Sequence, residues 1–150
     1  MSVQSSVGTV MAVDNAAPAS YDSTGFASLS WVDVGQLSDL PSFGSEASLA
    51  SHTPLKTGIV AKRRGSLNFG SVTLTLALDA SDAGAAVLET LADSPAGSDA
   101  QVSVRVTLVG GAIQYYTAQV MSFKANVGNA DAITMAECTL EIDNSIIKVP

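Results

Sequence analysis

The sequence predicts a mainly β protein, an antiparallel β-sandwich or flattened barrel with one short α-helix and a long extended arm. Apolar side chains alternate with small or polar ones in residues 71–78, 102–108 and 133–143. This alternation is typical of strands with one buried face and one polar face. Glycine-containing pairs at 110–111 and 128–129 supply turns between strands. Several antiparallel strands and a single helical segment favour a closed or two-layered β architecture.

The first part of the chain has weaker signals. Residues 3–13 are a poor strand candidate, residues 14–25 have the composition of a loop, and residues 26–34 alternate as a strand that ends at Gly35. Residues 36–57 show no regular period but contain widely spaced large apolar residues. Long segments of this kind are usually functional or disordered, and the apolar residues argue against disorder. We therefore expect an extended arm over residues 36–57.

The second part is clearer. Residues 59–62 and 66–78 are expected to form a hairpin-like pair around Arg63, Arg64 and Gly65. A helix is expected over residues 82–92, capped by Asp79 or Ser81, with apolar side chains on one face. Residues 93–99 form a loop, and strands follow at 102–108, 113–123 and 133–143.

Length and charge limit the classes of function. The 150 residues make one domain, 1–150, large enough for a substantial core. Fourteen acids against seven bases give a formal net charge of −7, which lacks the basic footprint of a nucleic-acid-binding domain. We see no secretory signal and no apolar run long enough to cross a membrane, so we expect no membrane binding. The single cysteine fits a reducing compartment.

Candidate residues for chemistry are few and scattered. His52 is the only histidine and sits in a polar stretch, while Cys138 alternates onto an apolar face and is expected to be a core residue. The glycines at 65 and 70 have P-loop spacing without its lysine. Asp79, Asp82 and Asp99 could offer oxygens to calcium, but capping explains the first two more simply. The sequence thus predicts no enzyme, no cofactor and no metal site.

An order of features over residues 26–143 resembles a known family. Residues 32–35 (VDVG) precede a Leu-Pro-x-Phe-Gly loop at 40–44 and an arm ending in LKTG at 55–58. A strand at 65–78, an Asp-x-x-Asp-x-Gly helix start at 79–84, the glycine pair at 110–111 and a turn at 126–131 follow. In this order the chain is similar to the major tail tube protein of long-tailed, non-contractile bacteriophages.

The resemblance implies a structural protein of the virion tail. Such subunits form rings of six whose sheets join into an inner barrel, and the rings stack into a hollow tube through which DNA passes into the host. Implied partners are further copies of the chain and the tape measure, terminator and distal tail proteins, with assembly in the bacterial host cytoplasm. DNA would pass without specific binding. Some members carry a C-terminal immunoglobulin-like domain, which we do not expect here because the sequence ends at Pro150.

Three sets of residues are candidates for that role. Exposed apolar segments usually find a partner, so we expect contacts between subunits from apolar residues of the arm and the C-terminal segment. These residues are Leu37, Leu40, Phe43, Leu49, Leu55, Ile146, Ile147 and Val149. Acids on a lumen would repel phosphate and favour sliding; the candidates are Asp33, Glu137, Glu141 and Asp143. Lys62, Arg63 and Arg64 are candidates for ion pairs between subunits.

Two alternatives remain open. A tail terminator or a secretion-tube ring protein would have the same fold. A carbohydrate-binding β-sandwich would need an aromatic platform, for which Trp31, Tyr115 and Tyr116 are the candidates. Tyr115 and Tyr116 are neighbours in a strand and so face opposite ways, which leaves Trp31.

Overall fold

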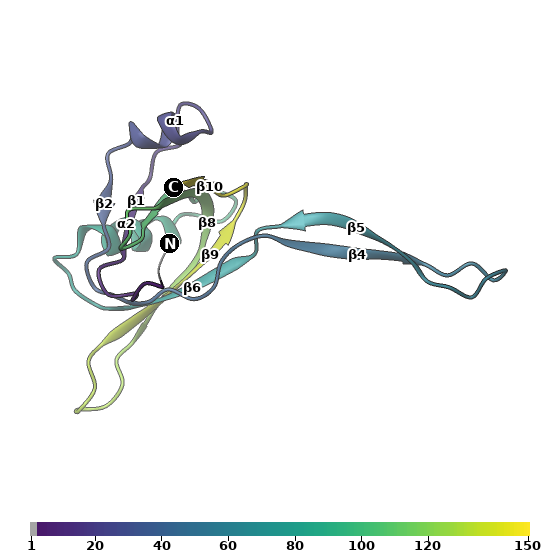
Figure 1. Ribbon diagram of the computed structural model, residues 1–150. Helices are drawn as coiled ribbons and strands as arrows, with labels where there is room; N and C mark the ends of the chain where they lie inside the picture. The colour runs from purple at the N-terminus through teal and green to yellow at the C-terminus, as the bar shows by residue number, and fades with distance from the viewer. Residues whose placement is uncertain (1–2) are drawn as a thin grey trace.

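The computed structural model describes residues 3–150 and shows a curled antiparallel sheet with a two-stranded arm projecting from it (Figure 1). The elements in chain order are β1 (Val10–Asp14), α1 (Ser23–Ala27), β2 (Val32–Asp33), β3 (Leu37–Asp39), β4 (Glu46–His52), β5 (Ala61–Asn68), β6 (Ser71–Ala77), α2 (Ala83–Ala92), β7 (Gln101–Thr107), β8 (Ile113–Asn126), β9 (Met135–Ile142) and β10 (Ile147–Val149). The predicted mainly β, antiparallel class is confirmed. The sheet is a half-barrel, and a second short helix, α1, accompanies the expected one.

The main sheet has the order β2-β1-β7-β8-β9-β6-β3, and β10 pairs with the beginning of β8. Side chains on one face of every long strand meet in a single core, with Leu74, Val104 and Leu140 fully buried. We call this the inner face. α2 packs over it through Leu88, with Val87 and Leu91 at the margin. The opposite, outer face carries the polar positions of the same strands.

The helix predicted at 82–92 is α2, and its cap is Asp82, one or three residues beyond the two capping candidates. The Asp82 carboxylate accepts hydrogen bonds from the backbone N–H groups of Ala85, Gly35 and Gln36 at 3.5, 3.3 and 3.1 Å. It therefore joins the start of α2 to the chain that leaves β2. Gly84 allows this close approach, because a Cβ there would lie 2.5 Å from the Asp33 carbonyl oxygen.

The prediction of a strand over residues 26–34 is wrong for most of that range. Residues 23–27 form α1, and only Val32 and Asp33 pair, with β1. The Asp22 carboxylate accepts from the Gly25 N–H at 2.7 Å, which starts a helical turn, and Phe26 is buried by packing rather than by strand pairing.

The prediction of a hairpin around residues 63–65 is also wrong. β5 runs unbroken through these residues and pairs with β4, while β6 pairs with β9 and β3. Gly65 lies at a β-bulge, where a Cβ would be 2.7 Å from the Ser48 hydroxyl. The break between β5 and β6 is instead at Gly70, whose φ is +80°.

Candidate assembly surfaces

The arm consists of residues 46–68, which differs from the expected span of 36–57. Residues 37–39 form β3 at the edge of the main sheet, where Leu37 pairs with Leu76. Leu40 and Phe43 are half-buried against the core, and the Phe43 ring centroid lies 5.6 Å from that of Tyr116. Three of the predicted subunit contacts, Leu37, Leu40 and Phe43, therefore belong to the body.

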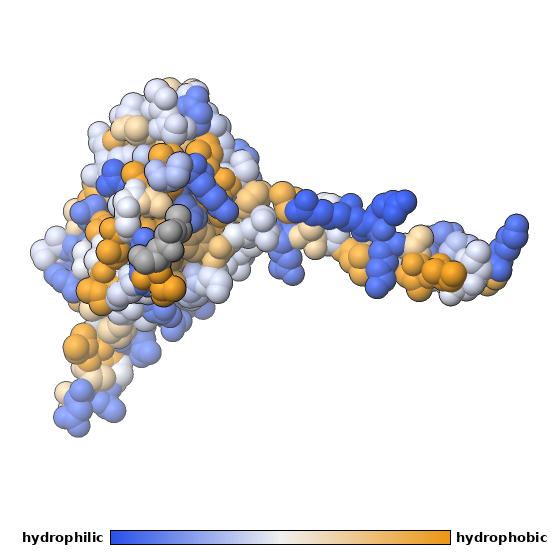
Figure 2. All heavy atoms as spheres, in the orientation of Figure 1, coloured by the Kyte–Doolittle hydropathy of each residue, from blue (hydrophilic) through white to orange (hydrophobic). Residues whose placement is uncertain are grey.

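Leu49 and Leu55 lie on the arm itself. Leu49 is 67% exposed in β4, and Leu55 is fully exposed in the connection to β5, with Ile59 and Val60 exposed nearby. Within residues 3–150 no other helix or strand packs extensively on β4 or β5. Figure 2 shows apolar and charged side chains mixed along this projecting ribbon. An isolated two-stranded ribbon has marginal stability in water, so the arm is a strong candidate for contact with another molecule.

The basic cluster lies within the arm, at mid-strand and not at a turn. Lys62, Arg63 and Arg64 pair with Ser51, Ala50 and Leu49 of β4. All three side chains are exposed, and none forms an ion pair within residues 3–150. Their charge is therefore available to a partner.

The C-terminal apolar residues fold back onto the body. Ile147 and Val149 lie in β10 and pair with Tyr115 and Ile113 of β8. Ile146 packs against the core, and all three are half-buried. A role in subunit contacts, predicted for these residues, stays a prediction.

The outer face carries all four predicted lumen acids. Glu137 and Glu141 are exposed on β9, opposite Thr75 and Ser71 of β6, with a Thr73–Thr139 pair between them. Asp143 follows on the same side. Asp33 lies on the same side at the other end of the sheet, where it pairs with Ala12, and Ala12 pairs in turn with Arg105. The open part of this surface over β6 and β9, which we call the polar face, consists of Ser71, Thr73, Thr75, Glu137, Thr139 and Glu141.

Two of these acids have internal partners. The Asp143 carboxylate accepts from the Thr117 hydroxyl at 2.6 Å and from the side-chain amides of Gln101 and Gln119. Asp33 lies 4.0 Å from an Arg105 nitrogen. Glu137 and Glu141 form no hydrogen bond or ion pair through their side chains within the described residues, so they present free carboxylates on the polar face.

Residues 15–31, which we call the aromatic loop, cover the other end of the outer face. The Asp14 carboxylate closes the loop by accepting from the Ala16 and Ser30 N–H groups at 3.1 and 3.0 Å. Phe26 stacks on Tyr115 with centroids 5.2 Å apart, and Trp31 stacks on the same ring at 5.9 Å. Sequence reasoning missed this packing, because residues 26–34 were expected to form a strand and the stacking partner, Tyr115, is distant in the sequence.

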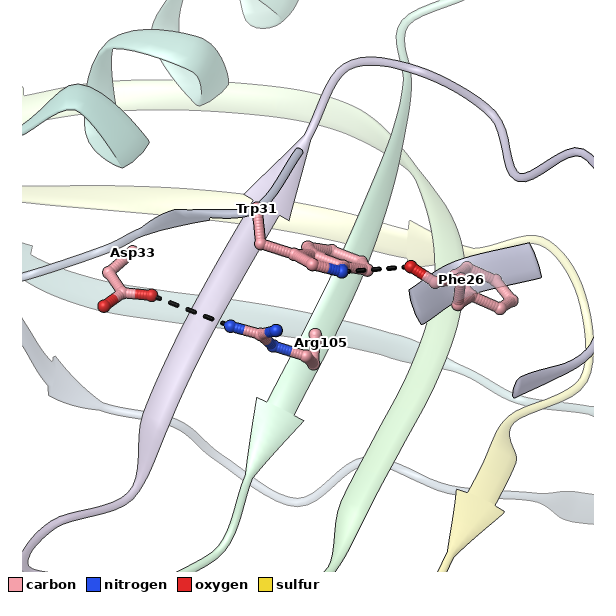
Figure 3. A network of polar contacts seen from close by, with 4 residues as sticks. All are labelled: Phe26, Trp31, Asp33 and Arg105. Carbon is pink, nitrogen blue, oxygen red and sulfur yellow. Dashed lines mark hydrogen bonds and ion pairs between the residues drawn. The ribbon is translucent and has the colours of Figure 1, made fainter. Parts of the chain in front are cut away.

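The aromatic loop leaves no aromatic platform of the kind that the carbohydrate-binding alternative requires. Trp31 is half-buried between Tyr115 and Arg105, and its Nε1–H donates to the Phe26 carbonyl oxygen at 3.0 Å (Figure 3). Tyr115 and Tyr116 face opposite sides of the sheet, as predicted, since Tyr116 contacts Phe43 on the inner face. A flat exposed aromatic surface is therefore not formed by these three rings.

The structure offers little support for catalysis. Burial raises the pKa of the Cys138 thiol to about 12, as expected for a core residue and not for a nucleophile. His52 is exposed at the end of β4. Asp79 has a lowered pKa because its carboxylate accepts hydrogen bonds from Ser81, and Asp22 has a lowered pKa because it accepts from Gly25 and Ser20. These are turn and cap interactions.

Residues 3–150 contain neither a cluster of metal-binding side chains nor a membrane-spanning helix. No three His, Cys, Asp or Glu side chains in that range are grouped so that they could hold a metal ion. None of its helices is long and apolar enough to span a bilayer. A hollow of about 660 Å³ at the base of the arm is lined by Glu46, Glu141 and mainly small polar residues, without a histidine or cysteine beside them.

The fold is shared with proteins of several tail-like assemblies. No protein-family model and no curated protein sequence matches the chain. Among solved structures, a chain in the tail of an empty gene transfer agent particle with C6 symmetry is 13% identical, covers 99% of this chain and 100% of its own length, and has a TM-score of 0.67. A chain in the sheath/tube terminator of the PVC extracellular contractile injection system is 11% identical over 100% and 99%, with a TM-score of 0.69.

A third likeness is to a chain in the baseplate of the anti-feeding prophage, at 12% identity over 99% and 97% of the two chains and a TM-score of 0.65. Each likeness spans nearly the whole of both chains, and at these identities it establishes a common fold. A tail-tube-like fold, predicted from the order of sequence features, is therefore confirmed. The matches include a contractile system, so the fold extends beyond the non-contractile phage tails that the sequence resembles.

Proposed function

We propose that this chain is a structural, non-enzymatic subunit of a phage-like tail tube. Copies would form rings of six, and the rings would stack into a hollow conduit through which DNA is delivered. The observation that carries the proposal is the likeness along nearly the full length of both chains to a chain in a C6-symmetric gene transfer agent tail. The finer assignment, to a long-tailed non-contractile phage, rests on the order of sequence features alone.

The polar face suits the wall of a lumen. Its threonine and serine hydroxyls remain solvated in a wet channel at no desolvation cost. Glu137 and Glu141 add negative charge that repels a passing phosphate backbone, and one cation, Lys124 of β8, lies opposite Glu137 at the margin of this set. A surface of this chemistry lets DNA slide without capture, which is what a conduit requires.

The arm suits contact with a neighbouring subunit. It carries exposed Leu49 and Leu55 beside the cations Lys62, Arg63 and Arg64. The chain as a whole is acidic, so another copy offers carboxylates to these cations. Burial of the leucines and pairing of the charges would together stabilise the ribbon that is exposed in the single chain.

The proposed partners follow from the same role. Further copies of the chain form the tube, and the tape measure, terminator and distal tail proteins adjoin it in the particle. Assembly would take place in the bacterial host cytoplasm, and the finished protein would lie in the virion tail.

Negative-stain electron microscopy tests the proposal. Purified protein is imaged when fresh and after concentration and incubation. We expect hollow tubes of uniform width built from stacked rings. Protein that stays monomeric at every concentration, including in the presence of tail-tip proteins from its own genomic neighbourhood, would contradict self-assembly.

A tube terminator is the second candidate. The likeness to a chain in the PVC sheath/tube terminator favours it, at a TM-score of 0.69. A terminator closes a tube and does not extend it. Single closed rings that never stack in the same micrographs would support this candidate over a tube subunit.

A further inference from the structure

Arg105 is the most enclosed cation on the outer face. It projects from β7 across β1 toward β2, where the Asp33 carboxylate lies 4.0 Å from its Nη2 atom (Figure 3). Its guanidinium carbon lies 5.2 Å from the ring centroid of Trp31. The side chain is 28% exposed and that of Asp33 is 64% exposed. The charge is therefore held at a protein surface but reaches water only in part.

The hydrogen-bonding capacity of this guanidinium is unused. It carries five N–H donors. None of them donates a hydrogen bond to any residue of the range 3–150, and Nε is buried without a partner. The contact with Asp33 at 4.0 Å is longer than a hydrogen bond. Unpaired donors in a partly desolvated position cost free energy, so an added acceptor would be favoured here.

The surroundings hold the guanidinium in place. Trp31 is fixed by its hydrogen bond to the Phe26 carbonyl oxygen and by its stacking on Tyr115. The Asp14 carboxylate fixes both ends of the aromatic loop. A cation resting on an immobile indole loses little further freedom when it binds, which favours binding. A planar guanidinium fork of this kind matches a carboxylate.

We propose that Arg105 is a receptor for a carboxylate of a second copy of this chain, with Trp31 as the floor of the site. This inference rests on the proposed self-assembly. The chain supplies the ligand in excess, with fourteen acids against seven bases. Within residues 3–150 only Asp33 lies within ion-pair distance of a basic side chain. A neighbouring copy therefore brings several uncompensated carboxylates.

The position of the site agrees with that partner. β2 is the terminal strand of the main sheet, and Arg105 is two strands in from that edge. A subunit adjoining the sheet at β2 would bring its side chains over Asp33 and within reach of the guanidinium. A nucleic-acid phosphate is the less favoured ligand, because Asp33 and the net charge of −7 repel it.

Four variants test the site against a purely internal role. Arg105→Lys keeps the charge and loses the fork, Arg105→Gln loses both, and Asp33→Asn removes the internal carboxylate. Lys124→Gln is the matched control, because it removes one positive charge from an exposed position on the outer face, opposite Glu137. Each variant is measured for its guanidinium chloride unfolding midpoint and for the concentration at which it assembles in sedimentation velocity. Emission from Trp31, the chain's only tryptophan, reports on the site itself.

We expect Arg105→Lys and Arg105→Gln to raise the assembly concentration about tenfold or more, while Lys124→Gln should leave it unchanged. Asp33→Asn should assemble at least as well as the parent chain, because a competing carboxylate is gone. Trp31 emission should shift on assembly of the parent chain. Assembly of both Arg105 variants at the parent concentration would overturn the inference and leave the proposed function intact.

Equal losses of stability in Arg105→Gln and Asp33→Asn, with assembly reduced in both, would also overturn the inference, because they indicate an internal brace. A Trp31 response to duplex DNA that exceeds the response to assembly would assign the site to phosphate instead. If the parent chain stays monomeric, acetate is titrated into it at constant ionic strength. A saturable Trp31 shift that is lost in Arg105→Gln supports the site even then, and its absence overturns it.

Discussion

Substitution of Leu55 by aspartate separates the arm's proposed role in assembly from the stability of the single chain. Leu55 is fully exposed in the connection between β4 and β5. A polar residue at such a position changes the free energy of unfolding by no more than about 0.5 kcal/mol. If a neighbouring subunit covers it, burial of the leucine contributes about 1.5–3 kcal/mol to the contact. That range corresponds to an assembly concentration raised by about 10- to 150-fold.

Phe43→Asp supplies the contrast. The sequence alone placed Phe43 on the arm, whereas its ring packs against Tyr116 and the core. Loss of a packed phenylalanine typically costs about 3–5 kcal/mol in a core, and this half-buried ring should cost somewhat less. We therefore expect Phe43→Asp to lower the unfolding midpoint, and Leu55→Asp to leave it unchanged while blocking assembly.

The assay combines chemical denaturation with sedimentation velocity over a concentration series. Val7→Asp is the control, since Val7 is an exposed apolar residue away from the arm. Assembly of Leu55→Asp at the parent concentration would show that no neighbouring subunit covers the arm tip. A loss of several kcal/mol of folding stability in Leu55→Asp would refute the view that the arm does not pack on its own body.

Three further predictions concern the body. Tyr116→Phe should stabilise the chain by about 1 kcal/mol in thermal unfolding, because the buried Tyr116 hydroxyl has no partner. The control, Tyr115→Phe on the opposite face, should shift the unfolding temperature less. Destabilisation by Tyr116→Phe would show that the hydroxyl has a hydrogen-bond partner. Asp82→Ala should cost about 2–3 kcal/mol in denaturant unfolding, because three backbone N–H groups lose their acceptor. A loss below about 0.5 kcal/mol would show that the Asp82 carboxylate does not join α2 to the chain after β2. The Cys138 thiol should resist thiol reagents at pH 8 until the protein unfolds. Burial raises the pKa of the thiol from 9.0 to about 12, so its contribution to stability is complete below pH 9 and is lost as the pH rises toward 12. Cys138→Ala should therefore lose less stability at alkaline pH than the parent chain does.

The strands that were predicted well from the sequence are those with one buried face. Residues 71–77, 101–107 and 135–142 alternate because each contributes side chains to the inner core on every second position. α2 was predictable for the same reason, through its apolar stripe and its early aspartates. Burial on one side leaves a period in the sequence, and that period is readable without a structure.

The sequence of the arm shows no such period. All but one of the residues in β4 and β5 are exposed, so no core selects an alternation of apolar side chains along them. The prediction for the aromatic loop failed for a related reason. Phe26 and Trp31 are buried by stacking on Tyr115, a contact between distant parts of the chain that no local pattern records.

Three properties could be predicted from the sequence alone: the mainly antiparallel class, the composition of the two faces of each long strand, and the acidic charge that disfavours nucleic-acid capture. These properties depend on side-chain alternation and on charge counts, which are local or additive. The tertiary structure was needed to show that Asp33 shares the outer face with Glu137, Glu141 and Asp143, because strand order and register fix that arrangement. It also decided where the chain leaves the body as an arm and which arginine lies over Trp31. Pairing partners far apart in sequence set these features, and no local pattern specifies them.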